Sequence, residues 1–328
     1  MSRPKITIVT PSFNQAQFLE QTICSVLDQK YSNIEYLIID GGSTDGSVEI
    51  IKKYERHLTY WESIKDRGQS HAINKGLQMA TGDVFNWLNS DDYYSADALS
   101  TVAASFDDPS VRAVLGRSRI FEHPDRTIKI SAGTDVYPGN LAKTVGWARI
   151  DQPETFFRLS AYRKVGALNE SLHFLMDREW WIRYLVNFGP HDTVAIPDVL
   201  VNFRQHALSK TTRQQAGFEQ ELIRITSSLG MACGYPNIHQ MFEIDQLGIS
   251  YYFTDVQKEQ LRAAVSYAIL FLAEYFYYYR NDTRKAKLFL NNLAKSDLSA
   301  EDVKLHRKLQ VRVNFLPPLL RKFYHKFS

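Results

Sequence analysis

Two adjacent carboxylates, Asp91 and Asp92, are the residues of this sequence best suited to metal chemistry. They follow a short apolar run, 84–88, that we expect to form a buried strand of an α/β sheet. Open α/β sheets bind ligands at the carboxyl ends of such strands. Neighbouring acids repel each other unless a cation or hydrogen-bond donors offset their charges. The pair could therefore hold Mg²⁺ or Mn²⁺ with a diphosphate, or one acid could cap the helix beginning near Ser95.

The elements that would position these acids alternate between strand and helix. We expect strands over 5–10, 34–40, 58–61 and 84–89, with helices over 17–29, 48–54 and 68–79. This alternation with short links predicts a parallel, doubly wound sheet, in which Pro11 ends the first strand. Polar residues at or just after the strand ends would converge on one crevice, and they include Ser12, Asp40, Asp66 and Asp91.

The pattern changes after residue 110, where shorter strands and turn residues appear, and from Thr212 the chain is almost wholly helical. We therefore predict a domain over 1–210, with halves 1–110 and 111–210, followed by a helical region over 211–328. The longest apolar run, 263–279, contains Ser266, Glu274 and five tyrosines. It is short and polar for a membrane span, so we interpret it as a core helix.

Composition bounds the class of protein. The chain has 328 residues, of which 44% are hydrophobic, as in a globular protein with a sizeable core. Its net charge of +3 gives no general reason to expect nucleic-acid binding. Two cysteines, Cys24 and Cys233, are too few for a zinc site of their own and suggest a reducing compartment. Because no signal peptide opens the sequence, we expect a cytoplasmic location.

Five blocks of sequence occur in an order found in a known family: 8–14, 25–29, 38–46, 66–76 and 88–92. Together they resemble the motifs of inverting glycosyltransferases of family 2, and the resemblance covers residues 4–206. It implies the GT-A fold, a Rossmann-like and mostly parallel central sheet flanked by helices, here with a C-terminal helical extension. It also implies sugar transfer from a nucleotide-sugar, with a UDP-sugar favoured, to an acceptor hydroxyl. Surface polysaccharide or a lipid-linked oligosaccharide would be the glycan acceptor.

The resemblance also implies roles for single residues. Pro11 and Ser12 would line the nucleotide pocket, while Asp40 and Asp66 would face the base or ribose. Asn74 would bind near the ribose or phosphates, Asp91 would contact the sugar-nucleotide, and Asp92 would ligate Mn²⁺ or Mg²⁺. The sequence departs from the family where many members carry two acids and this chain has Asp40 followed by Gly41. If the second acid is the usual base contact, Asp66 must replace it.

An inverting transfer needs a carboxylate that deprotonates the acceptor hydroxyl. In the family an acid at the start of a helix has this role, and Asp177 aligns with it. Glu179 points about 160° away around the helix and should face elsewhere. Alternatively, Asp177 only caps the helix. Val201 to His206 resembles a segment that returns to the active site, so that Arg204 could hold phosphate and His206 could ligate the metal, unless His206 is an ordinary surface residue.

The last segment, 303–328, contains seven Lys or Arg and no acid, mixed with apolar and aromatic residues. Such a basic amphipathic end suits the anionic inner face of a membrane, but a solvated helix or a dimer contact would give the same pattern. Two rival functions share the sheet. A nucleotidyltransferase would want a glycine-rich basic loop after the first strand, which 10–17 lacks. A non-catalytic sugar-nucleotide-binding protein would not need Asp91, Asp92 and Asp177 intact.

Overall fold

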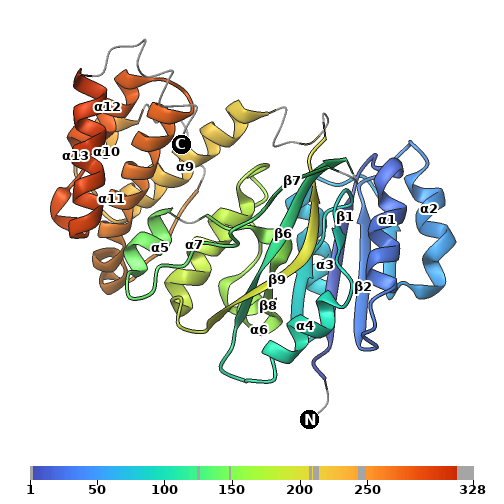
Figure 1. Ribbon diagram of the computed structural model, residues 1–328. Helices are drawn as coiled ribbons and strands as arrows, with labels where there is room; N and C mark the ends of the chain where they lie inside the picture. Colours follow the sequence, from blue (N-terminus) through green and yellow to red (C-terminus); the bar gives the residue numbers. More distant parts are fainter. Residues whose placement is uncertain are drawn as a thin grey trace. The chain divides into compact units, whose positions relative to one another are not determined.

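The computed structural model describes residues 3–123, 126–147, 149–206, 209, 214–242 and 249–315 (Figure 1). The chain divides into two compact units, and neither is continuous in sequence. The first comprises Met1–Asp135 and Arg149–Glu219, and the second comprises Val136–Ala148 and Gln220–Ser328. The single boundary predicted at residue 210 therefore misses the segment 136–148, which leaves the first unit and belongs to the second.

The first half of this unit is the predicted alternation of strands and helices. In order it contains β1 (Ile6–Ser12), α1 (Ala16–Leu27), β2 (Ile34–Asp40), α2 (Ser47–Tyr54), η1 (Glu55–His57), β3 (Tyr60–Ser63), α3 (Gln69–Met79) and β4 (Val84–Trp87). All four strands are parallel, in the order β3-β2-β1-β4. The crossovers predicted from the short links are thus present.

The prediction that Pro11 ends the first strand is wrong, because β1 continues to Ser12. The amide of Leu88 donates to the carbonyl of Val9, so the backbone polar groups of Val9 point toward β4. Those of Pro11, two residues later, point the same way. There β4 no longer pairs with β1, whose last partner in that ladder is Val9. The missing N–H of proline therefore costs no ladder hydrogen bond.

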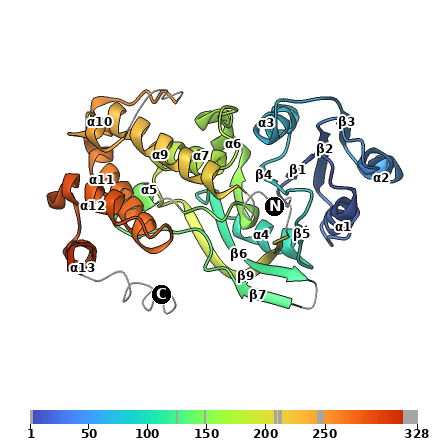
Figure 2. The same cartoon turned by 90° about the horizontal axis from the view of Figure 1, so that it is seen from above.

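Helices cover both faces of this sheet. Ile6 and Ile8 of β1 belong to a buried core that also contains apolar residues of α1, α2 and α4 (Ala98–Ser105). Val9 points to the opposite face, where a Cβ on Gly76 of α3 would lie only 2.5 Å from it. Figure 2 shows α3, α6 (Leu159–Val165) and α7 (Met176–Phe188) on one side of the sheet, with α1 and α4 on the other.

The second half of the unit extends the sheet with mixed directions. Its strands are β5 (Tyr93–Tyr94), β6 (Ala113–His123), β7 (Arg126–Ile130), β8 (Thr155–Arg158) and β9 (Thr193–Arg204), with η2 (Gln152–Glu154) before β8. The path of the sheet is β3-β2-β1-β4-β8-β6-β9-β5, with β7 beside β6. Trp180 and Trp181 of α7 are fully buried, and both rings pack near Phe157 of β8. They are core residues.

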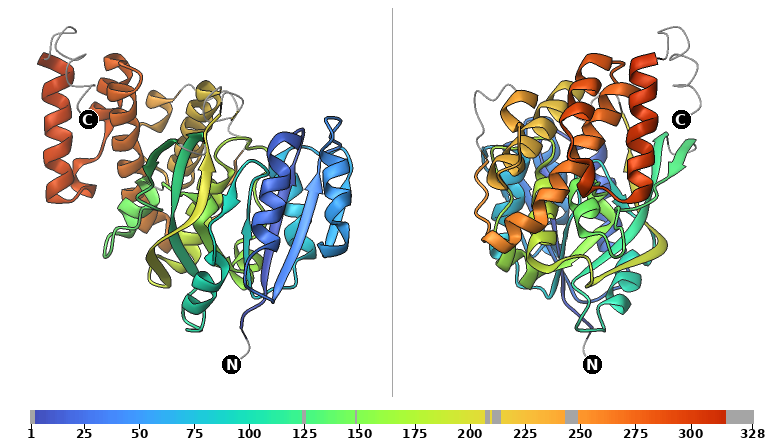
Figure 3. Two further views of the ribbon diagram at one scale, coloured as in Figure 1. Left: turned by 45° about the vertical axis from the view of Figure 1, so that its right-hand side comes forward. Right: turned by 90° about the vertical axis from the view of Figure 1, so that its left-hand side faces the viewer.

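The second unit is helical (Figure 3). It contains α5 (Leu141–Trp147), most of α9 (Gln215–Ala232), α10 (Ile238–Met241), α11 (Asp255–Tyr278), α12 (Thr283–Asn292), η3 (Lys295–Asp297) and α13 (Ala300–Phe315). α11 is the predicted core helix, and a capping box of Thr254 and Gln257 fixes its start. None of the helices in the described ranges is long and apolar enough to cross a membrane. Of the predicted basic tail, 316–328 lies outside the described residues.

α5 packs tightly into the second unit although it lies well before the other helices of that unit in sequence. A Cβ on Gly146 would lie 2.3 Å from the carbonyl oxygen of Ala264, so only glycine permits this approach to α11. Lys143 pairs with the buried carboxylate of Asp302 at 2.8 Å. These contacts make α5 an integral part of the helical unit.

Candidate active site

A cavity of about 760 Å³ lies in the first unit at the carboxyl ends of the parallel strands. The carboxyl end of β1 contributes Pro11 and Ser12 to its wall, and the segments that follow β2, β3 and β4 contribute Gly41, Asp66 and Asp91. The second half of the unit closes it with residues of 152–153 and 173–177 and with Phe218. The crevice predicted from the strand ends is therefore a real cavity, and the predicted residues Asp92, Asp177 and Arg204 also line it.

Asp92 is the most constrained acid of the site. Its side chain is 1% exposed, and Oδ1 accepts a hydrogen bond from the backbone N–H of Arg204 at 2.9 Å. Oδ2 is buried without a hydrogen-bond partner among the described residues. Burial, followed by the charge of Asp91, raises the pKa of Asp92 well above its ordinary value. A buried, unpaired carboxylate oxygen beside a second acid fits a site for a cation.

The second acid, Asp91, is held by His206, whose Nε2 lies 3.1 Å from Asp91 Oδ2. His206 was predicted to be a metal ligand, but it does not belong to the cavity wall and contacts Asp91 instead. Within the described ranges, no group of three His, Cys, Asp or Glu side chains is arranged to hold a metal ion. The donors fit an ion that takes one or two carboxylates from the protein and its remaining ligands from phosphate and water oxygens, as Mg²⁺ does.

Arg204 was predicted to hold phosphate. It lines the cavity, but its Nε donates to the Asp91 carbonyl at 3.0 Å. Its guanidinium also hydrogen-bonds to Gln21 and lies 4.6 Å from the centroid of the Phe18 ring. These contacts orient the loop that carries the acids, and they link that loop to α1.

Asp40 and Asp66 occupy different positions from each other, although both were predicted to face the base or ribose. Asp40 is fully buried and does not line the cavity. Its two carboxylate oxygens accept hydrogen bonds from the Ser63 hydroxyl, from the backbone N–H groups of Gly42 and Ser43, and from the Ser43 hydroxyl. It holds the turn, which is the alternative to ligand contact. Asp66 lines the cavity, and its Oδ1 accepts from the Gly68 N–H at 2.8 Å.

Gly41 explains how Asp66 reaches the cavity wall. A Cβ at this position would lie 2.9 Å from Asp66 Oδ2 and 3.1 Å from its Cγ. Glycine at this position therefore leaves room for the Asp66 carboxylate where it lies. The Asp66 carboxylate occupies the space that a side chain at position 41 would need.

Asn74 was predicted to bind the ribose or phosphates, but it lies outside the cavity wall and is 3% exposed. Its Nδ2 donates to the Leu168 carbonyl at 2.9 Å, and its Oδ1 accepts from the Leu168 N–H at 2.8 Å. Nδ2 also lies 3.3 Å from Glu170, which pairs with Arg67. Asn74 thus clamps α3 to the loop that leads into α7, and this role replaces the predicted ligand contact.

Asp177 lies in the first turn of α7 and on the cavity wall. Its Oδ1 accepts from the N–H of Arg178 at 2.7 Å, and burial raises its pKa to about 6. A carboxylate with this pKa is suited to take a proton near neutral pH. Glu179 faces elsewhere, as predicted, because it is buried in an ion pair with Arg183 at 2.8 Å.

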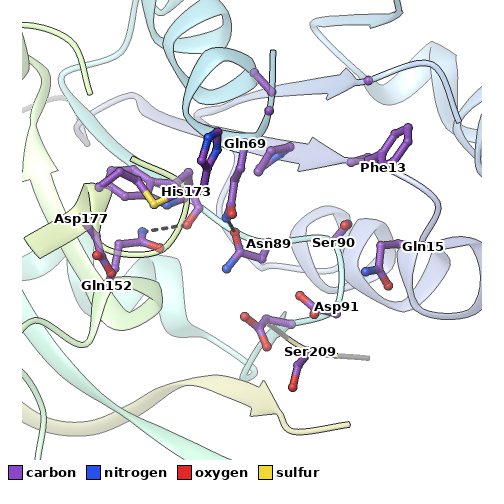
Figure 4. Close-up of a pocket in the computed structure, with 18 of the residues that line it drawn as sticks. Phe13, Gln15, Gln69, Asn89, Ser90, Asp91, Gln152, His173, Asp177 and Ser209 are labelled. Carbon is purple, nitrogen blue, oxygen red and sulfur yellow. Dashed lines mark hydrogen bonds between the residues drawn. The ribbon is translucent and has the colours of Figure 1, made fainter. Parts of the chain in front are cut away.

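Pro11 and Ser12 line the cavity as the sequence predicted. The exposed ring of Phe13 and the lack of a partner for the Ser12 hydroxyl among the described residues were not predicted. The ring of Phe13 lines the cavity and is 60% exposed, which offers a flat platform at one end. Ser12 Oγ is buried on the wall and, within the part of the chain that the structure describes, has no hydrogen-bond partner. Figure 4 shows Phe13 and Asp177 at opposite ends of the cavity, with Asn89 and Asp91 between them. Exposure of an aromatic residue after a strand cannot be inferred from residue type alone.

The sheet has helices on both faces and acids at its carboxyl edge, an arrangement that suits a GT-A type glycosyltransferase, and the comparisons give the family. The model of glycosyl transferase family 2 matches residues 7–184, and the chain belongs to this family. An uncharacterized glycosyltransferase of Mycobacterium tuberculosis is 30% identical over 208 residues, which cover 62% of this chain and 76% of the relative. TuaG of Bacillus subtilis, named for teichuronic acid biosynthesis, is 37% identical over 102 residues, or 30% of this chain and 40% of TuaG.

Solved structures show the same fold. Residues 1–349 of TarS from S. aureus, in complex with UDP-GlcNAc, give a TM-score of 0.62 at 16% identity, covering 94% of this chain and 86% of that one. A mannosyltransferase of Pyrobaculum calidifontis in complex with GDP-Man and Mn²⁺ gives 0.53 at 18% identity, covering 99% and 84%. The chain spans 52% of a longer TarS chain. At these identities the likeness shows the fold alone.

Proposed function

We propose that this glycosyltransferase moves a sugar from a UDP-sugar to an acceptor hydroxyl with inversion at the anomeric carbon, assisted by Mn²⁺ or Mg²⁺. One observation carries the proposal: the acid pair Asp91–Asp92 and the acid Asp177, from opposite halves of the first unit, line the same cavity. The pair suits the cation and diphosphate of a donor. Asp177 suits the proton of an acceptor.

The order of residues along the cavity supports this assignment. At one end, Phe13 offers a flat surface for a base. Ser12, the preceding residue, offers a wall hydroxyl with no partner among the described residues. We assign Asp66 to the same donor, since Gly41 leaves room for its carboxylate at the wall. Asp91 lies between Phe13 and Asp177 in Figure 4, as a diphosphate lies between its nucleoside and the reacting carbon.

We propose Asp91 and Asp92 as the residues that hold the metal, with His206 fixing the Asp91 carboxylate through its 3.1 Å contact. A bound divalent ion would neutralise charge that develops on the leaving diphosphate. This assignment uses the unpaired Asp92 Oδ2 and replaces His206 as a direct ligand. The mannosyltransferase that contains Mn²⁺ supports a divalent ion for this fold.

In the transfer, the acceptor oxygen forms a bond to the anomeric carbon from the face opposite the diphosphate. The bond between that carbon and the diphosphate oxygen breaks, and the diphosphate leaves with the electron pair. Asp177 takes the proton of the acceptor hydroxyl. Each step leaves charge balanced, because one carboxylate becomes neutral as one phosphate gains charge.

For the acceptor we propose a surface polysaccharide or a lipid-linked oligosaccharide, which the relationship to TuaG supports. We place the reaction in the cytoplasm, where the free thiols of Cys24 and Cys233 suit a reducing environment. The test is UDP release from a panel of UDP-sugars with Mn²⁺ and with chelator, followed by determination of the anomeric configuration of the product. Equal UDP release with Mn²⁺ and with chelator would refute the requirement for a metal ion. A product that retains the anomeric configuration of the donor would refute the inverting mechanism.

A further inference from the structure

The outer face of α13 combines positive charge with exposed apolar side chains. Lys304, Arg307 and Lys308 are exposed in its first and middle turns, and Val311 and Phe315 are 58% and 79% exposed nearer its end. At about 100° of rotation per residue, all five fall within an arc of about 100°. We call these five residues the α13 face. Glu301, at the first turn, is the single exposed acid within the described helix.

The orientation of this face is fixed by the opposite side of the helix. His306, Leu309 and Val313 are buried, and α13 packs on α11 and α12 through that side. Asp302 is also buried, and Lys143 neutralises it at 2.8 Å. The helix therefore cannot turn its cations inward without breaking packed contacts. Figure 3 shows α13, in red, along the outside of its helical unit.

The neighbouring helix α12 adds to the positive charge. Lys285 and Lys287 lie on it, and Lys287 is exposed together with the partly exposed Leu288. Over residues 280–315 the chain has nine Lys or Arg and four Asp or Glu. Three of those acids are engaged within the unit, since Asp282 caps α12, Asp297 accepts from Ser266 and Asp302 pairs with Lys143. The charge that remains at the surface is strongly positive.

We propose that the α13 face docks the protein on an anionic lipid bilayer. Lysine and arginine near such a surface are attracted by its negative potential, and apolar side chains at the same face enter the boundary between headgroups and acyl chains. A purely electrostatic partner, such as an acidic polysaccharide, would not need Val311 and Phe315 exposed. The α13 face would lie on the membrane and would not cross it. The proposal goes beyond the sugar transfer and does not depend on it.

The test is sedimentation of the full chain with vesicles of phosphatidylcholine alone and with phosphatidylglycerol added, at low and high salt. The main variant is K304E/R307E/K308E, and V311S/F315S tests the apolar part. The control is K30E/K52E/R56E, which makes the same change of net charge at three exposed cations of the first unit. Each cation near an anionic surface multiplies binding by about fivefold. The main variant loses three cations and gains three repelled carboxylates, so it should bind at least about 100-fold more weakly.

We expect wild type and control to sediment with anionic vesicles at low salt, and both α13 variants to be impaired. Salt should weaken wild-type binding, because charge is screened. Equal binding of wild type to neutral and anionic vesicles would overturn the proposal, as would unimpaired binding of K304E/R307E/K308E. So would binding to dextran sulfate without binding to vesicles, which would assign the face to a polyanion. A dimer lost in V311S/F315S, without vesicle binding, would assign it to self-association.

Discussion

Gly41→Ala tests whether the Asp66 carboxylate contacts the donor. The backbone of Gly41 does not lie in the left-handed region, so alanine is tolerated by the main chain and its effect is steric. The new methyl group would lie 2.9 Å from Asp66 Oδ2, which is too close, and 3.2 Å from Oδ1, which is tight. The Asp66 carboxylate must therefore shift from its place on the cavity wall, and the shift disturbs its 2.8 Å hydrogen bond from Gly68.

The size of the effect follows from the bond at stake. A hydrogen bond to a charged group contributes about 1.5–3 kcal/mol, so losing such a contact with the donor weakens binding by about 10- to 150-fold. Asp66→Ala removes the same contact and should fall in the same range. In the double variant the methyl group introduced by Gly41→Ala meets no carboxylate. Its effect on top of Asp66→Ala should therefore be close to zero.

The assay is calorimetric titration of UDP with Mn²⁺ into wild type, both single variants and the double variant. Thermal unfolding of each protein separates a local change from a loss of fold. If Gly41→Ala binds UDP as tightly as wild type, Asp66 is not where the donor binds. If the two single effects add in the double variant, the steric link between Gly41 and Asp66 is wrong.

Three further predictions concern the acids and the clamp. Asp177→Asn should lower turnover by about 10²–10⁴-fold at unchanged UDP affinity, and it should remove the wild-type fall in rate as pH drops through about 6, measured as a pH–rate profile. Because the folded pKa of Asp177 is raised, its charge costs stability above pH 6, and Asp177→Asn should melt no lower than wild type at pH 8. Asp92→Asn keeps an acceptor for the Arg204 N–H but loses the negative charge, so the affinity for UDP in titrations should no longer depend on Mn²⁺. If the affinity still depends on Mn²⁺ as in wild type, Asp92 does not bind the metal. Asn74→Ala leaves the N–H and C=O of Leu168 unpaired and should cost about 2–4 kcal/mol in urea unfolding, whereas the exposed helix residue Asn187→Ala should change little.

The sequence predicted the parts of the fold that depend on local pattern. β2 has the predicted bounds, 34–40, because a continuous apolar run between turn residues specifies a buried parallel strand. The presence of an acid at the start of α7 was also predicted, together with the orientation of Glu179. Each of these features depends on residues within one short segment, so the sequence of that segment is enough to predict it.

Roles that depend on distant partners could not be predicted in this way. Asn74 lies in a family motif, yet its partners Leu168 and Glu170 are 94 and 96 residues away in sequence. A motif marks the residue without saying whether its amide meets a ligand or a loop. The same holds for His206, whose partner Asp91 is 115 residues away. The domain boundaries could not be predicted for the same reason. The residues of 136–148 do not indicate that α5 packs with helices that follow residue 220.

The position of α5 also has a consequence for the order in which the protein can be assembled during synthesis. The ribosome releases α5 well before α11 and α13, which supply the Ala264 carbonyl against Gly146 and the Asp302 carboxylate for Lys143. Until then Val145, which is fully buried in the finished protein, has no helical partner. In the nascent chain the apolar side of α5 is therefore exposed until the ribosome has synthesised α11, the helix on which it packs. A chain cut after residue 219 would keep that helix permanently unmatched, so the catalytic unit cannot be isolated cleanly by a single truncation.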